Sequence, residues 1–277
     1  MCSFEDEGAW LLKKHKYKYD MAAKELWKNW DEEKHYGELF YKRATGESPE
    51  MESSKAVSRQ IKQFYTPGDK LLDVGCGAGH YLRSLRSIVD ADIDYSGVDP
   101  TAYYIELANK AYDGSANFKV GSIFDIPHPD NSFDIVICNN VVMHLPPEQI
   151  QKAFDELIRV SRRKIVVRAM FGERNYITRE ILTINDITPG AVDKVVYDDF
   201  DLTKSNFRYF NMYTQNFYEQ MILKNNKVTI KIQEDKDWQA FNNIPDAKVN
   251  TATKTLADFQ VSGNLILDWR FIFMDKE

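Results

Sequence analysis

The chain has 277 residues and a net charge of −6, with 43% hydrophobic and 28% charged residues. This composition is typical of a globular protein, and no apolar run approaches the roughly 20 residues that a membrane-spanning helix needs. The acidic balance disfavours nucleic-acid binding, which usually depends on a dense positive surface facing the phosphates.

The N-terminal residues and the cysteines favour a reducing compartment. Residues 1–7 (MCSFEDE) are acidic and lack the basic and apolar regions of a secretory signal. The three cysteines, Cys2, Cys76 and Cys138, are an odd set with no CxxC or Cys/His metal spacing. We therefore expect buried, reduced thiols, no metal site and a cytoplasmic protein.

Two basic clusters stand out from the acidic average, one at residues 13–18 (KKHKYK) and one at Arg159, Arg162, Arg163 and Lys164. Clusters of this size are more often solvated helix faces or loops than RNA sites, and we interpret both in that way. Nucleic acid is therefore a less favoured binding partner than a small molecule.

Residues 1–66 are polar and aromatic, without the alternation of a strand, up to a break at residues 66–69 (TPGD). We expect an N-terminal helical extension or lid there, in which the aromatic stretch 36–43 (YGELFYKR) either closes over a bound ligand or covers one edge of the sheet. One domain over residues 67–277 is expected to follow. Within that domain, residues 171–226 are expected to form an irregular insertion that covers the substrate. Two strand-like runs, at residues 228–232 and 265–273, close the chain.

Between residues 70 and 170, short apolar runs alternate with amphipathic helices. Strands are predicted at residues 71–74, 95–98, 117–120, 133–138 and 164–168. Helices are predicted over residues 81–89, after residue 101 and after residue 149, where Ile150, Phe154, Leu157 and Ile158 share one face. Strands that alternate with helices at this spacing require parallel pairing and right-handed crossovers, so the predicted fold class is α/β, doubly wound.

In a doubly wound sheet, ligands bind beyond the carboxyl ends of the strands. The first predicted strand runs into DVGCGAG, in which Gly75, Gly77 and Gly79 permit a tight turn and close approach of a ligand to the backbone. Such turns also occur for purely structural reasons. The G-x-G-x-G spacing differs from the dinucleotide pattern G-x-G-x-x-G, because His80 stands where the third glycine would fall. No Gly-Lys-Ser/Thr of a P-loop follows.

Two carboxylates bracket this turn. Asp73 precedes the glycines, where its charge would repel a pyrophosphate and suits a ligand with a positive amino group. Asp99 follows the second strand, where it can accept hydrogen bonds from both hydroxyls of a ribose; the alternative is a helix N-cap ahead of Ala102. The pair predicts a ligand that carries both an ammonium group and a ribose.

Several segments of this region resemble motifs of the class I S-adenosylmethionine-dependent methyltransferases, in order and spacing. Residues 71–79 (LLDVGCGAG) look like the family's first motif, and residues 95–100 (YSGVDP) are similar to the segment with its ribose-binding acid. Residues 126–136 (IPHPDNSFDIV), 141–145 (VVMHL) and 159–162 (RVSR) resemble three further motifs. The resemblance covers about residues 70–170 and is specific for cofactor and reaction type, not for substrate.

The resemblance implies a mostly parallel, seven-stranded sheet with an antiparallel last strand, in which residues 228–232 and 265–273 are candidates for the closing hairpin. It also implies S-adenosylmethionine as the cofactor. The implied binding residues are Asp73, Gly75, Cys76, Gly77, Gly79, Asp99, Pro100, Ser122, Ile123 and Asn139. Ser122 and Ile123 would flank the adenine, and Asn139 would contact the cofactor through its backbone. Many relatives carry aspartate at position 122, and serine is the weaker acceptor.

Methyl transfer to a hydroxyl needs a nucleophile aligned with the methyl group, exclusion of water and a base. His144, after the fourth strand, is the candidate base, with a structural histidine as an equal alternative. The candidate substrate contacts are Tyr36, Arg43, Arg208 and Tyr209. Residues 197–218 contain eight aromatic side chains, some or most of which are expected to pack the insertion onto the sheet.

We therefore predict an S-adenosylmethionine-dependent methyltransferase that modifies a small molecule, with an oxygen of a sugar or secondary metabolite as acceptor. The alternatives are a methyltransferase that acts on tRNA or protein, and a non-catalytic cofactor-binding partner subunit. A nicotinamide oxidoreductase is a more distant alternative. No membrane association is expected, and the sequence does not determine the oligomeric state.

Overall fold

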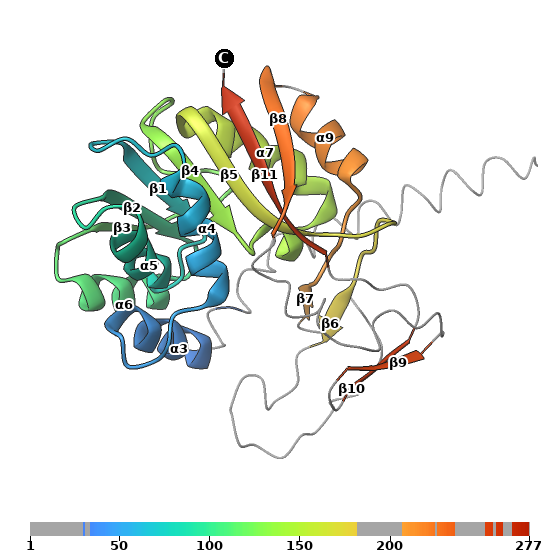
Figure 1. Ribbon diagram of the computed structural model, residues 1–277, viewed down its shortest axis with the longest axis horizontal. Coiled ribbons are helices and arrows are strands. Elements are labelled where there is room, and N and C mark those ends of the chain that lie inside the picture. Colours follow the sequence, from blue (N-terminus) through green and yellow to red (C-terminus); the bar gives the residue numbers. More distant parts are fainter. Residues whose placement is uncertain are drawn as a thin grey trace, which may run out of the picture.

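The computed structural model describes residue 30, residues 34–181 and, further along the chain, residues 207–224, 226–235, 253–256, 259–262 and 268–276. A seven-stranded sheet in the order β3-β2-β1-β4-β5-β11-β8 forms its centre (Figure 1). The strands are β1 Lys70–Val74, β2 Asp94–Asp99, β3 Asn117–Val120, β4 Phe133–Asn139, β5 Ser161–Phe171, β8 Val228–Glu234 and β11 Asp268–Lys276.

The strand directions confirm the predicted fold class. Strands β3, β2, β1, β4 and β5 pair in parallel, and β11 is antiparallel to both β5 and β8. The order reverses beside β1, whose two neighbours are β2 and β4. This is the position at which a doubly wound sheet opens a crevice for a ligand.

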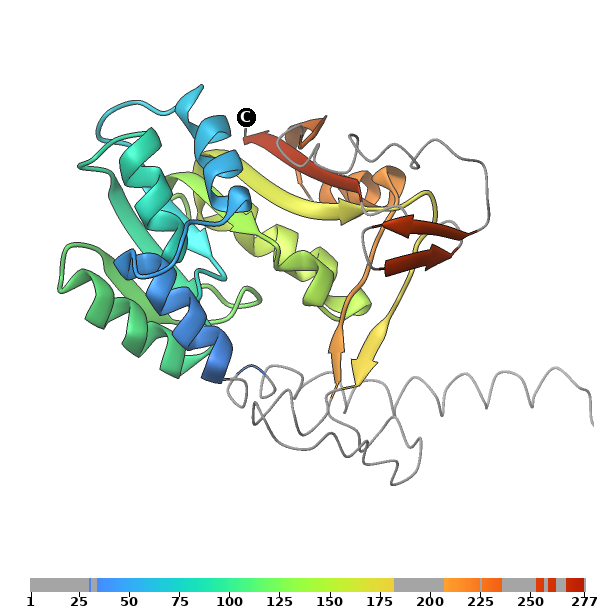
Figure 2. The same cartoon turned by 60° about the horizontal axis from the view of Figure 1, so that its bottom comes forward.

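Helices cover both faces of the sheet (Figure 1). Helices α4 (Glu52–Lys62), α5 (His80–Ile88) and α6 (Ala102–Tyr112) contribute to the core on one face. Helices α7 (Ile150–Val160) and α9 (Gln215–Leu223) contribute to the core on the other. Helix α3 (Lys34–Thr45) contacts α5 and α6 (Figure 2), so part of the polar N-terminal segment lies against the helices that follow β1 and β2.

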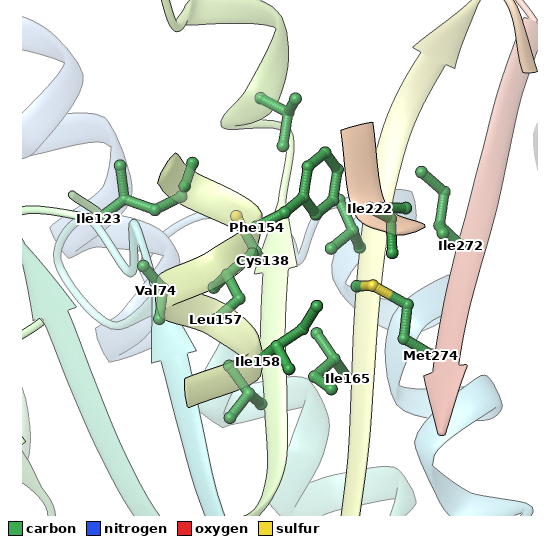
Figure 3. Packing of buried hydrophobic residues seen from close by; sticks show 14 of the residues in the cluster. Val74, Ile123, Cys138, Phe154, Leu157, Ile158, Ile165, Ile222, Ile272 and Met274 are labelled. Carbon is green, nitrogen blue, oxygen red and sulfur yellow. The ribbon is translucent and has the colours of Figure 1, made fainter. Parts of the chain in front are cut away.

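The core on the α7 face follows the apolar periodicity of the sequence. Phe154 and Leu157 are fully buried, and they point with Ile158 toward Cys138 and Ile165 on the sheet (Figure 3). Burying a side chain of this size stabilises the fold by about 1.5–3 kcal/mol, which is why the apolar face of α7 turns inward. The helix predicted after residue 149 is therefore confirmed.

Shorter elements complete the described structure. They are the 3-10 turns η1 Val142–His144 and η2 Pro147–Gln149, and the antiparallel pairs β6 Arg179–Ile181 with β7 Phe207–Tyr209 and β9 Thr253–Leu256 with β10 Phe259–Ser262. Of the eight aromatic residues singled out in the insertion, Tyr197 and Phe200 lie outside the described residues. Phe207, Tyr209, Tyr213 and Tyr218 are buried and pack the insertion onto the rest of the molecule.

The second basic cluster is paired with carboxylates. Arg159 bridges Glu156 and Asp130, at 2.7 and 2.8 Å. The other ion pairs are Arg162–Asp134, Arg163–Asp69 and Lys164–Asp275. Local neutralisation of this kind fits a solvated surface better than a phosphate-binding patch. The first cluster, at residues 13–18, lies outside the described residues.

Candidate active site

A cavity of about 210 Å³ opens at the carboxyl ends of β1, β2 and β4. Six of the residues singled out from the sequence line it: Gly75, Gly77, Asp99, Pro100, Asn139 and His144. Segments far apart in the chain thus meet where the strand order reverses. In the part of the chain that the structure describes, no cluster of His, Cys, Asp and Glu side chains could hold a metal ion, and no helix is long and apolar enough to cross a bilayer.

The glycine turn after β1 forms the floor of the cavity. The backbone N–H groups of Gly75 and Cys76 both donate to the carbonyl oxygen of Val98, at 2.7 and 3.1 Å, which ties the turn to β2. Gly75 has φ +80°, and a Cβ built on it would lie 2.3 Å from Cγ2 of Val141. Both the left-handed backbone and the crowding require glycine at this position.

Asp99 lies at the end of β2, and its carboxylate accepts two backbone N–H groups; the N-cap of α6 is Thr101, so the N-cap alternative weighed for Asp99 is wrong. Its Oδ2 accepts the backbone N–H of Gly77 and its Oδ1 accepts that of Thr101, each at 2.9 Å. Thr101 precedes the first residue of α6, so the carboxylate supports this helix start as well as the glycine turn. The side chain is 7% exposed and lines the cavity, which is the place predicted for a ribose-binding acid.

Asp73 lies behind the turn and does not line the cavity. It is 2% exposed, and the hydroxyl of Tyr95 donates to its Oδ2 at 2.8 Å. Burial raises the pKa of Asp73 to about 7; the Tyr95 hydrogen bond opposes this rise and the charge of Asp99 adds to it. A positive group brought near Asp73 would favour its ionised form.

Four more residues of the predicted cofactor set do not line the cavity. Cys76 is fully buried in the core, and Gly79 precedes α5 with φ +75°. Ile123 is buried on the α7 face, and the Ser122 hydroxyl accepts the backbone N–H of Phe124 at 3.1 Å. Direct contact of these side chains with a cofactor remains a prediction.

His144 lies on η1, between β4 and α7, and its side chain lines the cavity. Its Nδ1 is 2.7 Å from the backbone carbonyl oxygen of Tyr209. A carbonyl only accepts hydrogen bonds, so Nδ1 carries the proton and Nε2 holds the lone pair in the neutral ring. Burial lowers the pKa of His144 to about 4, and the ring is therefore neutral near pH 7.

An aromatic and cationic group adjoins His144. Trp30 makes an edge-on contact with the imidazole, with 5.2 Å between ring centroids. The Arg208 guanidinium lies 5.7 Å from the ring centroids of both Trp30 and Tyr36, and its Nε donates to Glu180 at 2.5 Å. Three candidate substrate residues, Tyr36, Arg208 and Tyr209, thus gather near the proposed base.

Arg43, the fourth candidate substrate residue, does not join that group. Its backbone carbonyl oxygen accepts from Nη1 of Arg83 at 3.2 Å, and its charge acts on His80.

The sequence interpretation missed several residues that line the cavity. They are Trp30, Met51, His80, Tyr81, Thr101, Tyr104, Asn140 and Val141, whereas Phe40 belongs to the aromatic stretch 36–43 that was expected to close over the ligand. Phe40 of α3 stacks on His80 with 4.4 Å between ring centroids and 9° between the planes. Only His80 carried a signal, because it replaces a glycine of the dinucleotide pattern. The others come from the N-terminal segment or from loop positions whose orientation depends on packing.

Comparison with known proteins agrees with this geometry. Residues 72–165 match the family model described as a methyltransferase domain. The chain is 30% identical over 118 residues to an uncharacterised methyltransferase of Schizosaccharomyces pombe, covering 39% of this chain and 41% of that protein. It is 29% identical over 133 residues to the 27-O-demethylrifamycin SV methyltransferase of Amycolatopsis mediterranei, covering 46% of this chain and 47% of that protein. The chain thus spans less than half the length of these relatives.

A solved structure shows the same fold. It is a chain of the Haloferax volcanii complex between the Trm112 methyltransferase activator and a putative methyltransferase, with a TM-score of 0.54 and 14% identity over 86% of this chain and 94% of that one.

Proposed function

We propose that this chain, whose residues 72–165 match the family model of a methyltransferase domain, transfers a methyl group from S-adenosylmethionine to a small molecule. The observation that carries the proposal is the cavity at the reversal of strand order, which brings the glycine turn, Asp99 and His144 together. A bound S-adenosylmethionine supplies a methyl group activated by its sulfonium.

The residues present fit this cofactor. Gly75 leaves the backbone open where a side chain would collide, and Asp99 offers a buried carboxylate to hydroxyl groups. Asp73 lies behind the turn with a pKa raised to about 7, and a cationic ligand nearby would favour its ionised form. Asn139 has buried side-chain polar atoms without a hydrogen-bond partner, as expected for a site that a polar ligand completes.

His144 is the proposed base for the acceptor hydroxyl. Its Nε2 lone pair is available at neutral pH, and its proton on Nδ1 is held by the Tyr209 carbonyl. A base whose pKa is lowered to about 4 takes a proton most readily from an acidic hydroxyl, so we propose an oxygen acceptor, and a phenolic hydroxyl of a secondary metabolite fits this base better than the weakly acidic hydroxyl of a sugar. The aromatic rings of Trp30 and Tyr36 would exclude water around it.

The two rival functions are a methyltransferase for tRNA or protein, and a non-catalytic partner subunit. The basic cluster on α7 and β5 is already paired with carboxylates, so it does not favour binding of the phosphate backbone of tRNA. Its members are Arg159, Arg162, Arg163 and Lys164. A partner subunit would bind the cofactor and turn over no acceptor, which the His144 experiment below distinguishes.

Asp99→Ala is expected to weaken binding of S-adenosylhomocysteine by about 1.5–3 kcal/mol, because hydrogen bonds to a charged group are lost. Isothermal titration calorimetry measures the effect. Asp94→Ala is the matched control, since Asp94 is an exposed aspartate at the other end of β2 and should leave the affinity unchanged. Equal affinities of wild type and Asp99→Ala would remove Asp99 from the site, and a wild-type protein that does not bind would overturn the function.

His144→Gln is expected to lower the rate of methyl transfer by about 10²- to 10⁴-fold, the usual contribution of a general base. Glutamine retains an N–H donor for the Tyr209 carbonyl and lacks a basic lone pair. The rate is measured with radiolabelled S-adenosylmethionine and those hydroxylated small molecules that wild type labels. His128→Gln, at a half-buried histidine outside the cavity, is the control.

An unchanged rate in His144→Gln would leave this histidine a structural role. Cofactor binding by wild type without label transfer to any acceptor would favour the partner-subunit function.

A further inference from the structure

Asn211 is a fully buried residue of the insertion that packs against the loop carrying His144. Its backbone N–H donates to the carbonyl oxygen of Met143 at 2.8 Å, and its Nδ2 donates to the carbonyl oxygen of Leu145 at 3.1 Å. Met143 and Leu145 are the neighbours of His144 in the chain. One asparagine therefore holds the backbone both before and after the proposed base.

The same stretch of the insertion also holds the imidazole. Nδ1 of His144 donates to the carbonyl oxygen of Tyr209, two residues before Asn211. The Phe210 ring, between them, lies 5.8 Å from the imidazole centroid. The turn η1 has three residues, and short 3-10 turns have hydrogen bonds of poor geometry, so contacts from outside must fix its shape. Residues 209–211 supply these contacts.

The β6–β7 pair orients the Asn211 side chain. The backbone N–H of Thr178 donates to Oδ1 of Asn211 at 3.1 Å, which leaves Nδ2 to face the Leu145 carbonyl oxygen. The backbone N–H of Phe210 donates to the Thr178 carbonyl oxygen at 2.9 Å, so Thr178 is itself tied to the segment that it orients. Both polar atoms of the amide are used, one within the insertion and one on the loop of the base.

We propose that Asn211 is a positioning residue that holds η1 so that Nε2 of His144 faces the acceptor hydroxyl, an inference that rests on the proposed function. The sheet supplies the loop after β4, and the insertion supplies the hydrogen bonds that fix it. A misplacement of about 1 Å at the reacting atoms can lower a rate by about 100-fold, so an amide that never touches the acceptor can still control the rate.

Asn211→Ala removes the side-chain amide and keeps the backbone hydrogen bond to Met143. We expect kcat for methyl transfer to fall about 10- to 100-fold, with KM and the affinity for S-adenosylhomocysteine within about threefold of wild type. In a His144→Gln background, Asn211→Ala should change the residual rate by less than about threefold, because Asn211 acts through the base. A residue needed only for folding would cost the same factor in both backgrounds.

Two further variants accompany this one. Asn175→Ala is the matched control, because Asn175 also lies in the insertion, where its Oδ1 accepts the backbone N–H of Thr214 at 2.8 Å, and kcat should stay near the wild-type value. Asn211→Asp retains the size of the side chain and the acceptor for Thr178, which protects the fold. As a carboxylate it has no N–H for the Leu145 carbonyl oxygen, so it should lower kcat as Asn211→Ala does.

The ring nitrogens of His144 give a readout that needs no acceptor. Burial lowers the pKa of His144 to about 4; the Tyr209 hydrogen bond and the charge of Glu180 oppose this shift, and the charge of Arg208 adds to it. Nitrogen-15 NMR should therefore show a neutral wild-type ring at about pH 5.5 with its proton on Nδ1, and His144→Gln identifies the signals. Release of the ring in Asn211→Ala should raise this pKa toward the ordinary value of about 6.5 and populate the tautomer with the proton on Nε2.

Thermal melting of each variant checks that it is folded. Wild-type kcat and an unshifted His144 titration in the Asn211 variants, or equal losses of rate in the wild-type and His144→Gln backgrounds, would overturn the inference and leave the proposed function in place. A wild-type protein that transfers no methyl group to any acceptor would overturn the proposed function, and the titration of His144 would still decide whether Asn211 holds the ring.

Discussion

Arg168→Met is expected to destabilise the fold by about 3–5 kcal/mol, the cost of breaking a buried ion pair. Arg168 lies on β5 and is 1% exposed. Its Nε donates to Oδ2 of Asp235 at 2.7 Å, and its guanidinium lies 4.1 Å from the Trp269 ring centroid. Methionine fills much of the space and removes the charge, so the carboxylate of Asp235 stays buried without its guanidinium partner.

The same substitution should disturb the cavity. Nη1 of Arg168 donates to Oδ1 of Asn140 at 2.6 Å, and Asn140 lines the cavity with a left-handed φ of +57°. Nδ2 of Asn140 in turn donates to the Tyr81 hydroxyl at 3.4 Å. Arg168 thus holds a strained loop residue whose orientation shapes the cavity wall.

Urea denaturation measures how far Arg168→Met lowers the free energy of unfolding, and Arg162→Met is the control. Arg162 pairs with Asp134 at 2.6 Å, but its side chain is 55% exposed, so its removal should cost less than about 1 kcal/mol. The double variant Arg168→Met/Asp235→Leu should recover most of the stability, because the buried carboxylate is removed together with its guanidinium partner. A cost for Arg168→Met no larger than that for Arg162→Met would contradict the prediction.

Gly75→Ala should lower the free energy of unfolding by about 2–5 kcal/mol and also abolish tight binding of S-adenosylhomocysteine. A left-handed φ costs a residue with a Cβ about 1–2 kcal/mol, and forcing a methyl group into packed space costs about 1–3 kcal/mol more. The new methyl group would lie 2.3 Å from Cγ2 of Val141, so the glycine turn and Val141 must move apart.

Gly68→Ala separates these two causes. Gly68 has φ +93°, and a Cβ built on it would meet nothing within 4 Å, so this variant has the backbone strain without the collision. Denaturation and calorimetry on both variants should show the larger loss, and the only loss of binding, in Gly75→Ala. Adding Val141→Ala to Gly75→Ala should restore part of the lost stability and part of the lost affinity for S-adenosylhomocysteine. Equal effects at the two glycines would show that crowding at Gly75 does not matter.

Local patterns in the sequence were sufficient to predict the strands of the parallel part of the sheet and the helices between them. The spacing of Ile150, Phe154 and Leu157 predicted α7, and all three side chains are fully buried. The glycine turn and the carboxylate after β2 were placed correctly at the crevice, because parallel strands bring their carboxyl ends to one edge. Hydrophobic periodicity and left-handed turns are properties of neighbouring residues, so a linear pattern records them.

Only the tertiary structure showed which side chains face the cavity. Asp73 was expected beside the ligand, and it lies behind the turn with Tyr95. Phe40 reaches the cavity because α3 packs against α5 and α6, a contact between segments about 40 to 65 residues apart that no local periodicity encodes. The tautomer of His144 likewise depends on the carbonyl of Tyr209, which lies 65 residues further along the chain. Secondary structure follows from short-range sterics and burial, whereas the set of residues that line a site depends on how distant elements pack.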